Sequence, residues 1–253
     1  MIKFHQVSKD LGGRRVLKAL DLEIHEHEVF VIVGPSGMGK SVLLKHMVRL
    51  LTPDTGRVVI DNEVISESTG EELDRIRRKF GYLFQDGALL QWLNVAENVA
   101  LPLEEKTDLS EAEIEEKVHE KLSLVGMERE LEKHPSELSG GMRKRVGLAR
   151  AMVMDPKIML YDEPTGGLDP VTSRMIDALI ADLQARLKVT SVVVTHDLHS
   201  ALKIGTRIGM LLNGKIVALG SPEEFLRSDQ PEVQEFLSAQ YITRRGDWEG
   251  YLK

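Results

Sequence analysis

Short apolar runs alternate with helix-like patterns along most of the chain. The run Val29–Val33 is apolar throughout, and similar buried strands are predicted at Ile158–Tyr161 and Ser191–Val194. Each is followed by polar residues and then by apolar positions at helical spacing, in the stretches 42–51, 171–187 and 198–204. Strands that alternate with helices are typical of a parallel sheet flanked by helices. We therefore expect an α/β core.

The segment from about residue 87 to residue 155 has a different pattern. A further strand is predicted just before it, at Phe80–Phe84, but the segment itself is helical in pattern and contains no convincing strand. Ser110 and Glu113 form a capping box that opens a charged amphipathic helix running to about Val125. We expect a mostly helical subdomain inserted into the α/β core.

Turn and cap signals define the last third of the chain. Asn213-Gly214 between apolar residues predicts a tight hairpin. Ser221 followed by Pro222 predicts the start of a helix, since proline is favoured at the first helical position. We expect one domain over residues 1–225, with its helical subdomain at about 87–155, and a C-terminal helical extension over 226–253.

Charge and composition exclude several classes of function. The net charge is −7 and no long Lys/Arg run occurs, so the basic surface typical of a nucleic-acid binder is missing and no nucleic-acid partner is expected. The chain has no cysteine, which excludes disulfides and thiolate metal sites. The first residues lack the apolar core of a signal peptide, and no run approaches the roughly 18–20 apolar residues needed to span a bilayer. We expect any membrane role to come through a partner.

A phosphate-binding loop is predicted where the first buried strand meets its helix. Residues 34–41 match the Walker A pattern G-x-x-x-x-G-K-[ST]. Glycines allow backbone N–H groups and the helix N-terminus to point at phosphate oxygens. Lys40, expected in a solvent-facing loop, should reach the β- and γ-phosphates, and the Ser41 hydroxyl should ligate Mg²⁺. The predicted phosphate-binding residues are Gly34, Pro35, Ser36, Gly37, Met38, Gly39, Lys40, Ser41 and Val42.

Two further segments carry candidate chemistry. Asp162 and Glu163 end a predicted buried strand, where Asp162 can hold Mg²⁺ and Glu163 can polarise an attacking water. Taken alone, such carboxylates are more often loop solvation or a helix cap. Ser139-Gly140-Gly141 offers a hydroxyl and two unobstructed amides at a helix N-terminus, which suits a phosphate, although Ser-Gly-Gly is also an ordinary N-cap. The basic residues 143–145 are interpreted as a solvated helix face.

Together these segments resemble the ABC ATPase family over residues 1 to 225. Residues 138–142 are similar to the family signature, residues 158–163 to Walker B, and Gly167-Leu168-Asp169 to the D-loop. Gln85 resembles the Q-loop glutamine and His196 the switch histidine. The resemblance implies a P-loop NTPase core with an antiparallel β subdomain and the inserted helical subdomain. A simple P-loop kinase or GTPase would leave the signature, the carboxylate pair and His196 unexplained.

The resemblance also implies a site shared between two chains. ATP would bind Lys40 and Ser41 of one subunit and residues 139–141 of the other, in an ATP-dependent head-to-tail homodimer. Glu163, His196 and Lys40 are the implied catalytic residues. Ser41, Gln85 and Asp162 are the implied Mg²⁺ residues, and Asp169 would cross the dimer interface. The family often stacks adenine on an aromatic ring, but Leu11 stands at that position here, so apolar packing by Leu11 and Val16 is expected instead.

Finer features suggest a branch of the family. Gly87-Ala88-Leu89, Met142, Tyr161 and Gly166-Gly167 resemble the ATPase subunits of Mla-type and Mce-associated lipid transporters. That resemblance implies a membrane-embedded permease, lipid-binding accessory subunits, and a position on the cytoplasmic face of the inner membrane. Gln91-Trp92-Leu93-Asn94 departs from the pattern and leaves the permease's identity open. The alternatives are an ABC ATPase for an amino acid or a lipoprotein, or a non-transport ABC protein.

Overall fold

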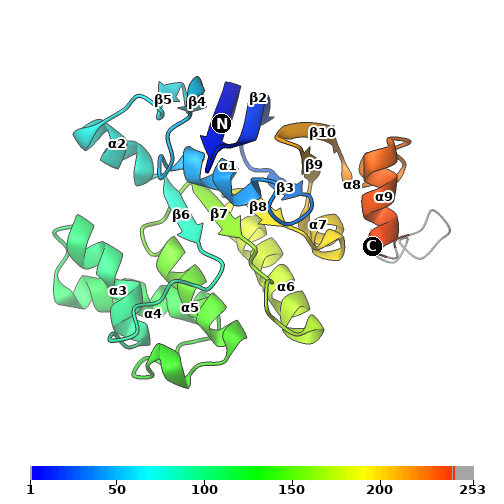
Figure 1. Cartoon of the computed structure of the whole chain (residues 1–253). Coiled ribbons are helices and arrows are strands. Elements are labelled where there is room, and N and C mark those ends of the chain that lie inside the picture. The colour runs from blue at the N-terminus through cyan, green and yellow to red at the C-terminus, as the bar shows by residue number, and fades with distance from the viewer. Residues whose placement is uncertain (1, 241, 243–253) are drawn as a thin grey trace. The chain divides into compact units, whose positions relative to one another are not determined.

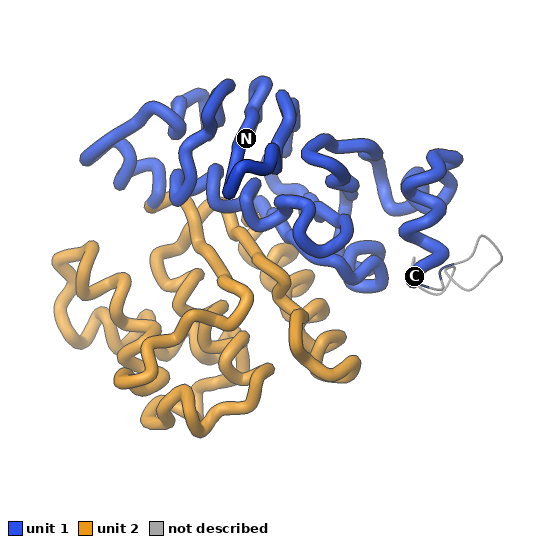
Figure 2. Tube along the Cα trace, in the orientation of Figure 1, with its two compact units in different colours: residues 1–77, 190–253 blue, residues 78–189 orange. Residues whose placement is uncertain are grey.

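The computed structural model describes residues 2–240 and residue 242. The chain divides into two compact units, the first formed by residues 1–77 and 190–253 and the second by residues 78–189 (Figure 2). The glycine-rich loop and His196 belong to unit 1. Asp162, Glu163, Gln85 and residues 139–141 belong to unit 2.

Unit 1 contains an antiparallel sheet. Its strands are β1 (Ile2–Leu11), β2 (Arg14–Ile24), β4 (Thr55–Ile60) and β5 (Glu63–Val64), in the order β2-β1-β4-β5 (Figure 1). Alternate residues such as Phe4, Leu20 and Val58 are buried, because successive side chains of a strand point to opposite faces. This sheet is the antiparallel β subdomain expected from the family resemblance.

Unit 1 also contains parallel strands with helices packed on them. β3 (Val29–Val33) pairs in parallel with β8 (Thr190–Thr195) and β9 (Arg207–Leu212), and β10 (Lys215–Gly220) pairs antiparallel with β9. All residues of β3 and β8 are buried, as is typical of parallel strands that are covered on both faces. The helices are α1 (Lys40–Met47), α2 (Gly70–Arg77), α7 (Leu198–Ile204), α8 (Pro222–Leu226) and α9 (Pro231–Ala239), of which α1 packs on β8 and α7 on β3.

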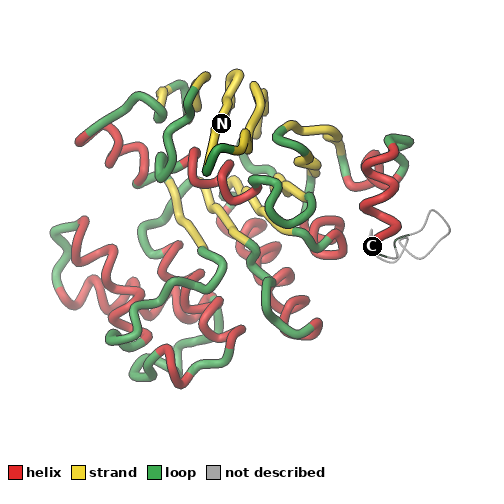
Figure 3. The backbone as a smooth tube through the Cα atoms, in the orientation of Figure 1, coloured by secondary structure: helices red, strands yellow, loops and turns green. Residues whose placement is uncertain are grey.

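Unit 2 is mostly helical, with yellow strand segments only at β6 and β7 in Figure 3. β6 (Phe80–Leu83) and β7 (Ile158–Asp162) pair in parallel. The helices are α3 (Val95–Lys106), α4 (Glu111–Leu124), the 3₁₀ turn η1 (Pro135–Glu137), α5 (Gly140–Met152) and α6 (Pro170–Leu187). Helix α5 packs against β6 and against α3, α4 and α6. It is therefore the central helix of this unit.

Most elements predicted from the sequence are confirmed. β3, β7, β8, α6 and α7 lie at or within one residue of the expected ranges, and Ser110 donates its N–H to Glu113 Oε2 at 2.8 Å at the start of α4. Asn213 and Gly214 both take positive φ, as the two-residue hairpin requires. The predicted extension over 226–253 contains α9, while residues 241 and 243–253 lie outside the described part of the chain.

The end of α1 differs from the prediction. The helix stops at Met47, although the apolar pattern continues to Leu51. Arg49 adopts φ 51°, outside helical geometry, and the Arg77 guanidinium donates to the carbonyls of Val48 and Arg49 at 3.0 and 3.1 Å. A side chain thus satisfies carbonyls at the helix end, where intrahelical partners are lacking. Apolar spacing alone does not show this cap.

Candidate functional site

The glycine-rich loop of unit 1 has a backbone that side chains would obstruct. Gly34 has φ 150°, and a Cβ placed on it would lie 2.3 Å from the Leu211 carbonyl oxygen. Gly39 has φ 96°, and its Cβ would lie 2.5 Å from Val16 Cγ1. The loop leads directly into α1, which begins at Lys40. Glycine is needed at position 34 because the Leu211 backbone approaches it closely, and at position 39 because of its positive φ and the adjacent Val16 side chain. The loop ends at the helix N-terminus, which favours an anion.

Lys40 is buried, contrary to the solvent-facing position expected from the sequence. Its side chain is 6% exposed, and Nζ donates to the Gly34 carbonyl at 2.8 Å and to the Pro35 carbonyl at 3.2 Å. The side chain curls back over its own loop, where the carbonyls of residues 34 and 35 accept its hydrogen bonds. A cation is therefore held at the centre of the loop, where phosphate oxygens would meet it.

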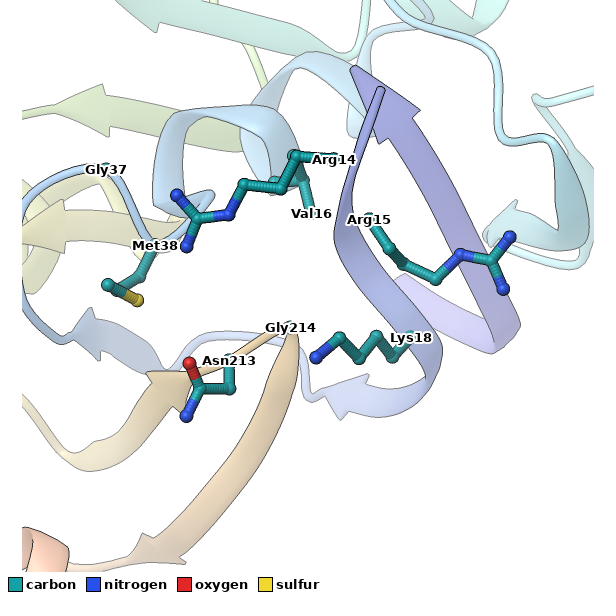
Figure 4. A pocket seen from close by; sticks show the side chains of 8 residues that line it. All are labelled: Arg14, Arg15, Val16, Lys18, Gly37, Met38, Asn213 and Gly214. Carbon is teal, nitrogen blue, oxygen red and sulfur yellow. The ribbon is translucent and has the colours of Figure 1, made fainter. Parts of the chain in front are cut away.

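A small cavity lies beside the loop and is lined by basic side chains (Figure 4). The Arg14 guanidinium extends toward Met38 and the Lys18 ammonium toward Asn213, whereas Arg15 points away and pairs with Asp10 at 2.9 Å. Val16 completes the lining together with Gly37 and Gly214. This side of the loop suits a polar, negatively charged ligand. Of the two predicted base-packing residues, the structure brings Val16 to the loop, while Leu11 lies at the β1–β2 turn, 37% exposed and opposite Arg14.

His196 follows the end of β8 and is exposed. The Thr195 hydroxyl accepts the Asp197 N–H at 3.0 Å, and Asp197 in turn caps α7 by accepting from the N–H groups of His199 and Ser200. Gln240, at the C-cap of α9, donates to the His196 carbonyl at 2.7 Å and accepts the Leu198 N–H at 2.8 Å. The backbone on both sides of Asp197 is thus held by side chains.

In unit 2, Asp162 and Glu163 occupy the carboxyl end of β7. Asp162 is 6% exposed, and its Oδ2 accepts a hydrogen bond from the Tyr82 hydroxyl at 3.2 Å. Burial raises the pKa of Tyr82, and the adjacent Asp162 charge raises it further, so the phenol stays a proton donor to the carboxylate. Tyr82 is a functional candidate that sequence reasoning missed.

Glu163 has an unusual backbone. Its φ is 48°, in the left-handed region that non-glycine residues seldom adopt. Its carbonyl oxygen accepts two hydrogen bonds, from the Gly166 N–H at 3.0 Å and from Lys144 Nζ at 2.9 Å. The same ammonium also donates to the Gln85 carbonyl. Lys144 therefore connects two of the predicted site residues.

The burial of Lys144 overturns the interpretation of residues 143–145 as a solvated helix face. The Lys144 side chain is only 4% exposed, and burial lowers its pKa, although the nearby carboxylates of Asp86, Glu163 and Asp162 act in the opposite direction. The neighbouring Arg143 and Arg145 also donate to backbone carbonyls, of Leu138 and of Val125 and Gly126. All three cations donate hydrogen bonds to backbone carbonyls of neighbouring segments, because α5 packs against several other elements of unit 2.

The predicted signature residues begin α5. Ser139 is its N-cap and accepts the Met142 N–H at 3.3 Å. A Cβ on Gly141 would lie 2.5 Å from the Thr172 methyl carbon, and one on Gly140 would lie 3.1 Å from Leu168. Asp169 caps α6, accepting from the Val171 and Thr172 N–H groups and from the Thr172 hydroxyl, which lowers its pKa. The segment 168–172 thus leaves no room for a Cβ at Gly141 unless Thr172 shifts, and it approaches Gly140 closely.

The candidate metal residues carry the donor type that Mg²⁺ prefers. Ser41 contributes a hydroxyl in unit 1, and Asp162 and Gln85 contribute a carboxylate and an amide in unit 2. Hydroxyl, carboxylate and carbonyl oxygens are hard ligands, and protein-bound Mg²⁺ usually completes its shell with waters and substrate phosphates. In the described part of the chain, no three His, Asp or Glu side chains gather as a metal-binding group.

Comparison with known proteins establishes the family. The family model described as ABC transporter matches residues 17–166, which is more than half of the chain. The chain belongs to the ABC transporter family. The match begins in β2 and ends just after β7, so it includes the glycine-rich loop, Gln85, the α5 N-terminus and the carboxylate pair. The protein is an ATP-binding, ATP-hydrolysing subunit of an ABC transporter.

Similar ABC proteins extend the match across nearly the whole chain. A probable ribonucleotide transport ATP-binding protein, mkl, of Mycobacterium tuberculosis is 45% identical over 241 residues, covering 95% of this chain and 67% of mkl. The glycine betaine/carnitine/choline transport ATP-binding protein OpuCA of Bacillus subtilis is 39% identical over 245 residues, covering 96% of this chain and 63% of OpuCA. A dimeric structure of the ATP-binding cassette MJ0796, in a post-hydrolysis state with ADP and Pi, has a TM-score of 0.81 and 37% identity, covering 88% of this chain and 99% of that chain.

The helices and the supporting side chains of this ABC ATPase were also compared with the expectations from the sequence. Among the described helices, none is both long and apolar enough to cross a bilayer. Three residues that contact the proposed site, Tyr82, Lys144 and Gln240, were not predicted from the sequence. Helical spacing could have indicated Lys144, because it lies three residues after Gly141 and four before Leu148, on the same buried face of α5. No comparable signal marks Tyr82 or Gln240.

Proposed function

We propose that this ABC transporter subunit binds MgATP at its glycine-rich loop and hydrolyses it with Glu163 as the residue that polarises the attacking water. The observation that carries this proposal is the burial of Lys40 within a loop whose glycines admit no side chain at positions 34 and 39. Ser41, Asp162 and Gln85 would hold Mg²⁺, which when bound neutralises phosphate charge. His196 would contact the γ-phosphate.

We further propose that two copies close head-to-tail around ATP, so that residues 139–141 of one copy complete the site of the other. Support comes from the similar MJ0796 cassette, which has been solved as a dimer with ADP and Pi. Ser139 at the N-cap of α5 and the adjacent glycines leave a helix N-terminus that suits a phosphate. In this arrangement Asp169 lies at the dimer interface, and its capping of α6 holds the adjacent backbone in place.

For the cargo, we propose a phospholipid or a related lipid, moved by a membrane-embedded permease with lipid-binding accessory subunits. The proposal rests on the resemblance of Gly87-Ala88-Leu89, Met142 and Tyr161 to the ATPases of Mla-type and Mce-associated transporters. In that setting the subunit works at the cytoplasmic face of the inner membrane. Residues 1–225 would form the ATPase domain, residues 87–155 its helical subdomain, and residues 226–253 an extension.

A second candidate cargo is a ribonucleotide. This alternative is favoured by the 45% identity to mkl, whose name assigns it to ribonucleotide transport. Names of other relatives point to further small solutes, such as glycine betaine for OpuCA and methionine for MetN. Both candidate classes use the same ATPase chemistry. They differ in what crosses the membrane.

Deletion and complementation in a diderm host that carries this gene separate the two cargoes. The deletion strain receives either the wild-type gene or Glu163→Gln, with equal expression verified by immunoblot. For a lipid cargo, deletion weakens the outer-membrane permeability barrier and alters the lipid distribution between membranes, and only the wild-type gene restores both. Loss of labelled ribonucleoside or ribonucleotide uptake with a normal lipid distribution would overturn the lipid assignment and leave the ATPase assignment standing.

A further inference from the structure

Lys144 is a buried cation between two loops of unit 2. Its ammonium donates to the carbonyl oxygens of Gln85 and Glu163, which lie 78 positions apart in the chain. The side chain is 4% exposed. A lysine in such a place loses hydration, so its two carbonyl partners must compensate for the loss. An apolar side chain of similar length would fill the same space without that cost.

The carbonyl of Glu163 belongs to a strained residue. A non-glycine residue at φ 48° persists only where its surroundings hold it, since the left-handed conformation is sterically unfavourable for a residue with a Cβ. Gly166 N–H supplies one bond to this carbonyl and Lys144 supplies the other. The direction of the Glu163 side chain follows from its backbone dihedrals. Lys144 therefore binds the backbone from which the Glu163 side chain projects.

The same face of α5 also holds the loop that follows Gln85. A Cβ on Gly147 would lie 3.0 Å from the Gly87 carbonyl oxygen, so helix and loop are in direct backbone contact there. Arg150 donates to the carbonyls of Gly87 and Ala88, both at 2.9 Å. Lys144, Gly147 and Arg150 are spaced by three residues and line one helix face. Of these three, Lys144 donates hydrogen bonds to both loops.

We propose that Lys144 is a positioning residue for ATP hydrolysis, which fixes the backbone of Glu163 against the Gln85 loop and so aims the Glu163 carboxylate. The inference rests on the proposed role of Glu163 in water activation. Because Lys144 belongs to the helix that Ser139 caps, any displacement of this helix within unit 2 is transmitted to both carbonyls. Loss of the ammonium should slow hydrolysis and leave ATP binding largely unchanged.

The first test compares Lys144→Met with Arg145→Met in the full-length chain. Arg145 is a matched control, since it lies on the same helix and also donates to two carbonyls, of Val125 and Gly126, away from both loops. Lys144→Met is expected to lower kcat by about 100-fold, the scale of a small misplacement of a catalytic group, with ATP affinity within about threefold of wild type. Arg145→Met is expected to retain wild-type kcat and affinity.

The second test restores the amine chemically. The chain contains no cysteine, so Lys144→Cys introduces a single thiol. Alkylation in denaturant with bromoethylamine, followed by refolding, produces a lysine-like side chain, while bromoethane produces a neutral one of similar shape. Wild-type protein taken through the same steps controls for refolding. The aminoethyl adduct is expected to regain most of the wild-type kcat, and the ethyl adduct to stay at the level of Lys144→Met.

Three results would overturn the proposal. The first is wild-type kcat in folded Lys144→Met or in the ethyl adduct. The second is an equal loss of kcat in Lys144→Met and Arg145→Met, with equally lowered thermal midpoints. The third is a fold that forms only when the amine is present, since Lys144 would then be a folding residue. Glu163→Gln is measured alongside, so that failure of the positioning role of Lys144 can be distinguished from failure of the catalytic role of Glu163. Near-normal hydrolysis in Glu163→Gln would refute the role of Glu163 itself.

Discussion

The side-chain amide of Gln240 bonds to the backbone on both sides of Asp197. Its Nε2 donates to the His196 carbonyl at 2.7 Å, and its Oε1 accepts the Leu198 N–H at 2.8 Å. Gln240 is the C-cap residue of α9, which lies outside the segment 17–166 that matches the family model. The described part of the C-terminal extension is therefore tied directly to the proposed switch histidine.

Gln240→Leu should lower the rate of ATP hydrolysis, because the loop carrying His196 loses two backbone restraints. Each net hydrogen bond contributes about 1 kcal/mol, so a loss of several-fold in kcat is expected. Gln234→Leu is the matched control, since Gln234 lies on the same helix but donates to the Ser228 carbonyl, away from the loop of His196. Steady-state ATPase assays of both variants measure this loss of kcat. Identical rates for the two variants would refute a positioning role for Gln240.

Lys40→Ala should weaken ATP binding by about 100-fold, the scale of a lost charge-assisted hydrogen bond. The fold should persist, because the two carbonyls that Nζ contacts belong to the loop itself. Lys45→Ala, in the last turn of the same helix, is the control for removing a cation from α1. Equilibrium binding of labelled ATP measures the effect, and circular dichroism verifies folding. Unchanged affinity in Lys40→Ala would contradict the assignment of the phosphate loop.

Ser139→Arg should block hydrolysis while Lys40 still binds ATP, because bulk and charge at the start of α5 obstruct a γ-phosphate held by the partner. Mixing Ser139→Arg chains with Lys40→Ala chains should restore roughly a quarter of wild-type activity, since half of the dimers are heterodimers with one intact site each. Two affinity tags verify that heterodimers form. Verified heterodimers without activity would argue against a site shared between chains.

We predict that residues 87–99 form the docking segment for the permease, because they directly follow the loop of Gln85 and carry the apolar residues Leu89, Leu90 and Trp92. Trp92 is 72% exposed, so Trp92→Asp should abolish co-purification with the permease. Its loop is held by Asn98, which accepts the Leu90 N–H and donates to the carbonyls of Leu90, Leu93 and Asn94. Thermal stability and ATP binding should therefore persist. Leu219→Asp, at a 53% exposed apolar residue of β10, is the control.

Asp substitutions at Leu89 and Leu90 provide a comparison for Trp92→Asp within the same segment. Leu90 is half-buried and Leu89 is 8% exposed, so substitution of either by Asp should lower the thermal midpoint as well. The alternative is that the whole segment belongs to the core of the helical subdomain. Unfolding caused by Trp92→Asp would support that alternative, whereas loss of the permease from a stable protein supports docking.

Local sequence determined much of this protein. Buried parallel strands require continuous apolar runs, so β3, β7 and β8 were predictable from hydrophobicity alone. The Asn213-Gly214 hairpin and the Ser221 cap were predictable because their chemistry acts over a few neighbouring residues. The glycine-rich loop was predictable for the same reason, since its phosphate-binding groups are consecutive. Family membership followed from the order and spacing of such segments.

Tertiary structure alone decided which side chains support these segments. Charge suggested that Lys144 is solvated, yet the packing of α5 inside unit 2 buries it against two distant carbonyls. The end of α1 depends on Arg77, and the loop of His196 depends on Gln240, residues 29 and 44 positions away from their partners. Likewise, only the folded structure shows that Trp92 is exposed whereas the nearby Leu89 is buried. Backbone carbonyls occur at every residue, so no sequence pattern shows which of them a remote donor will reach until the chain has folded.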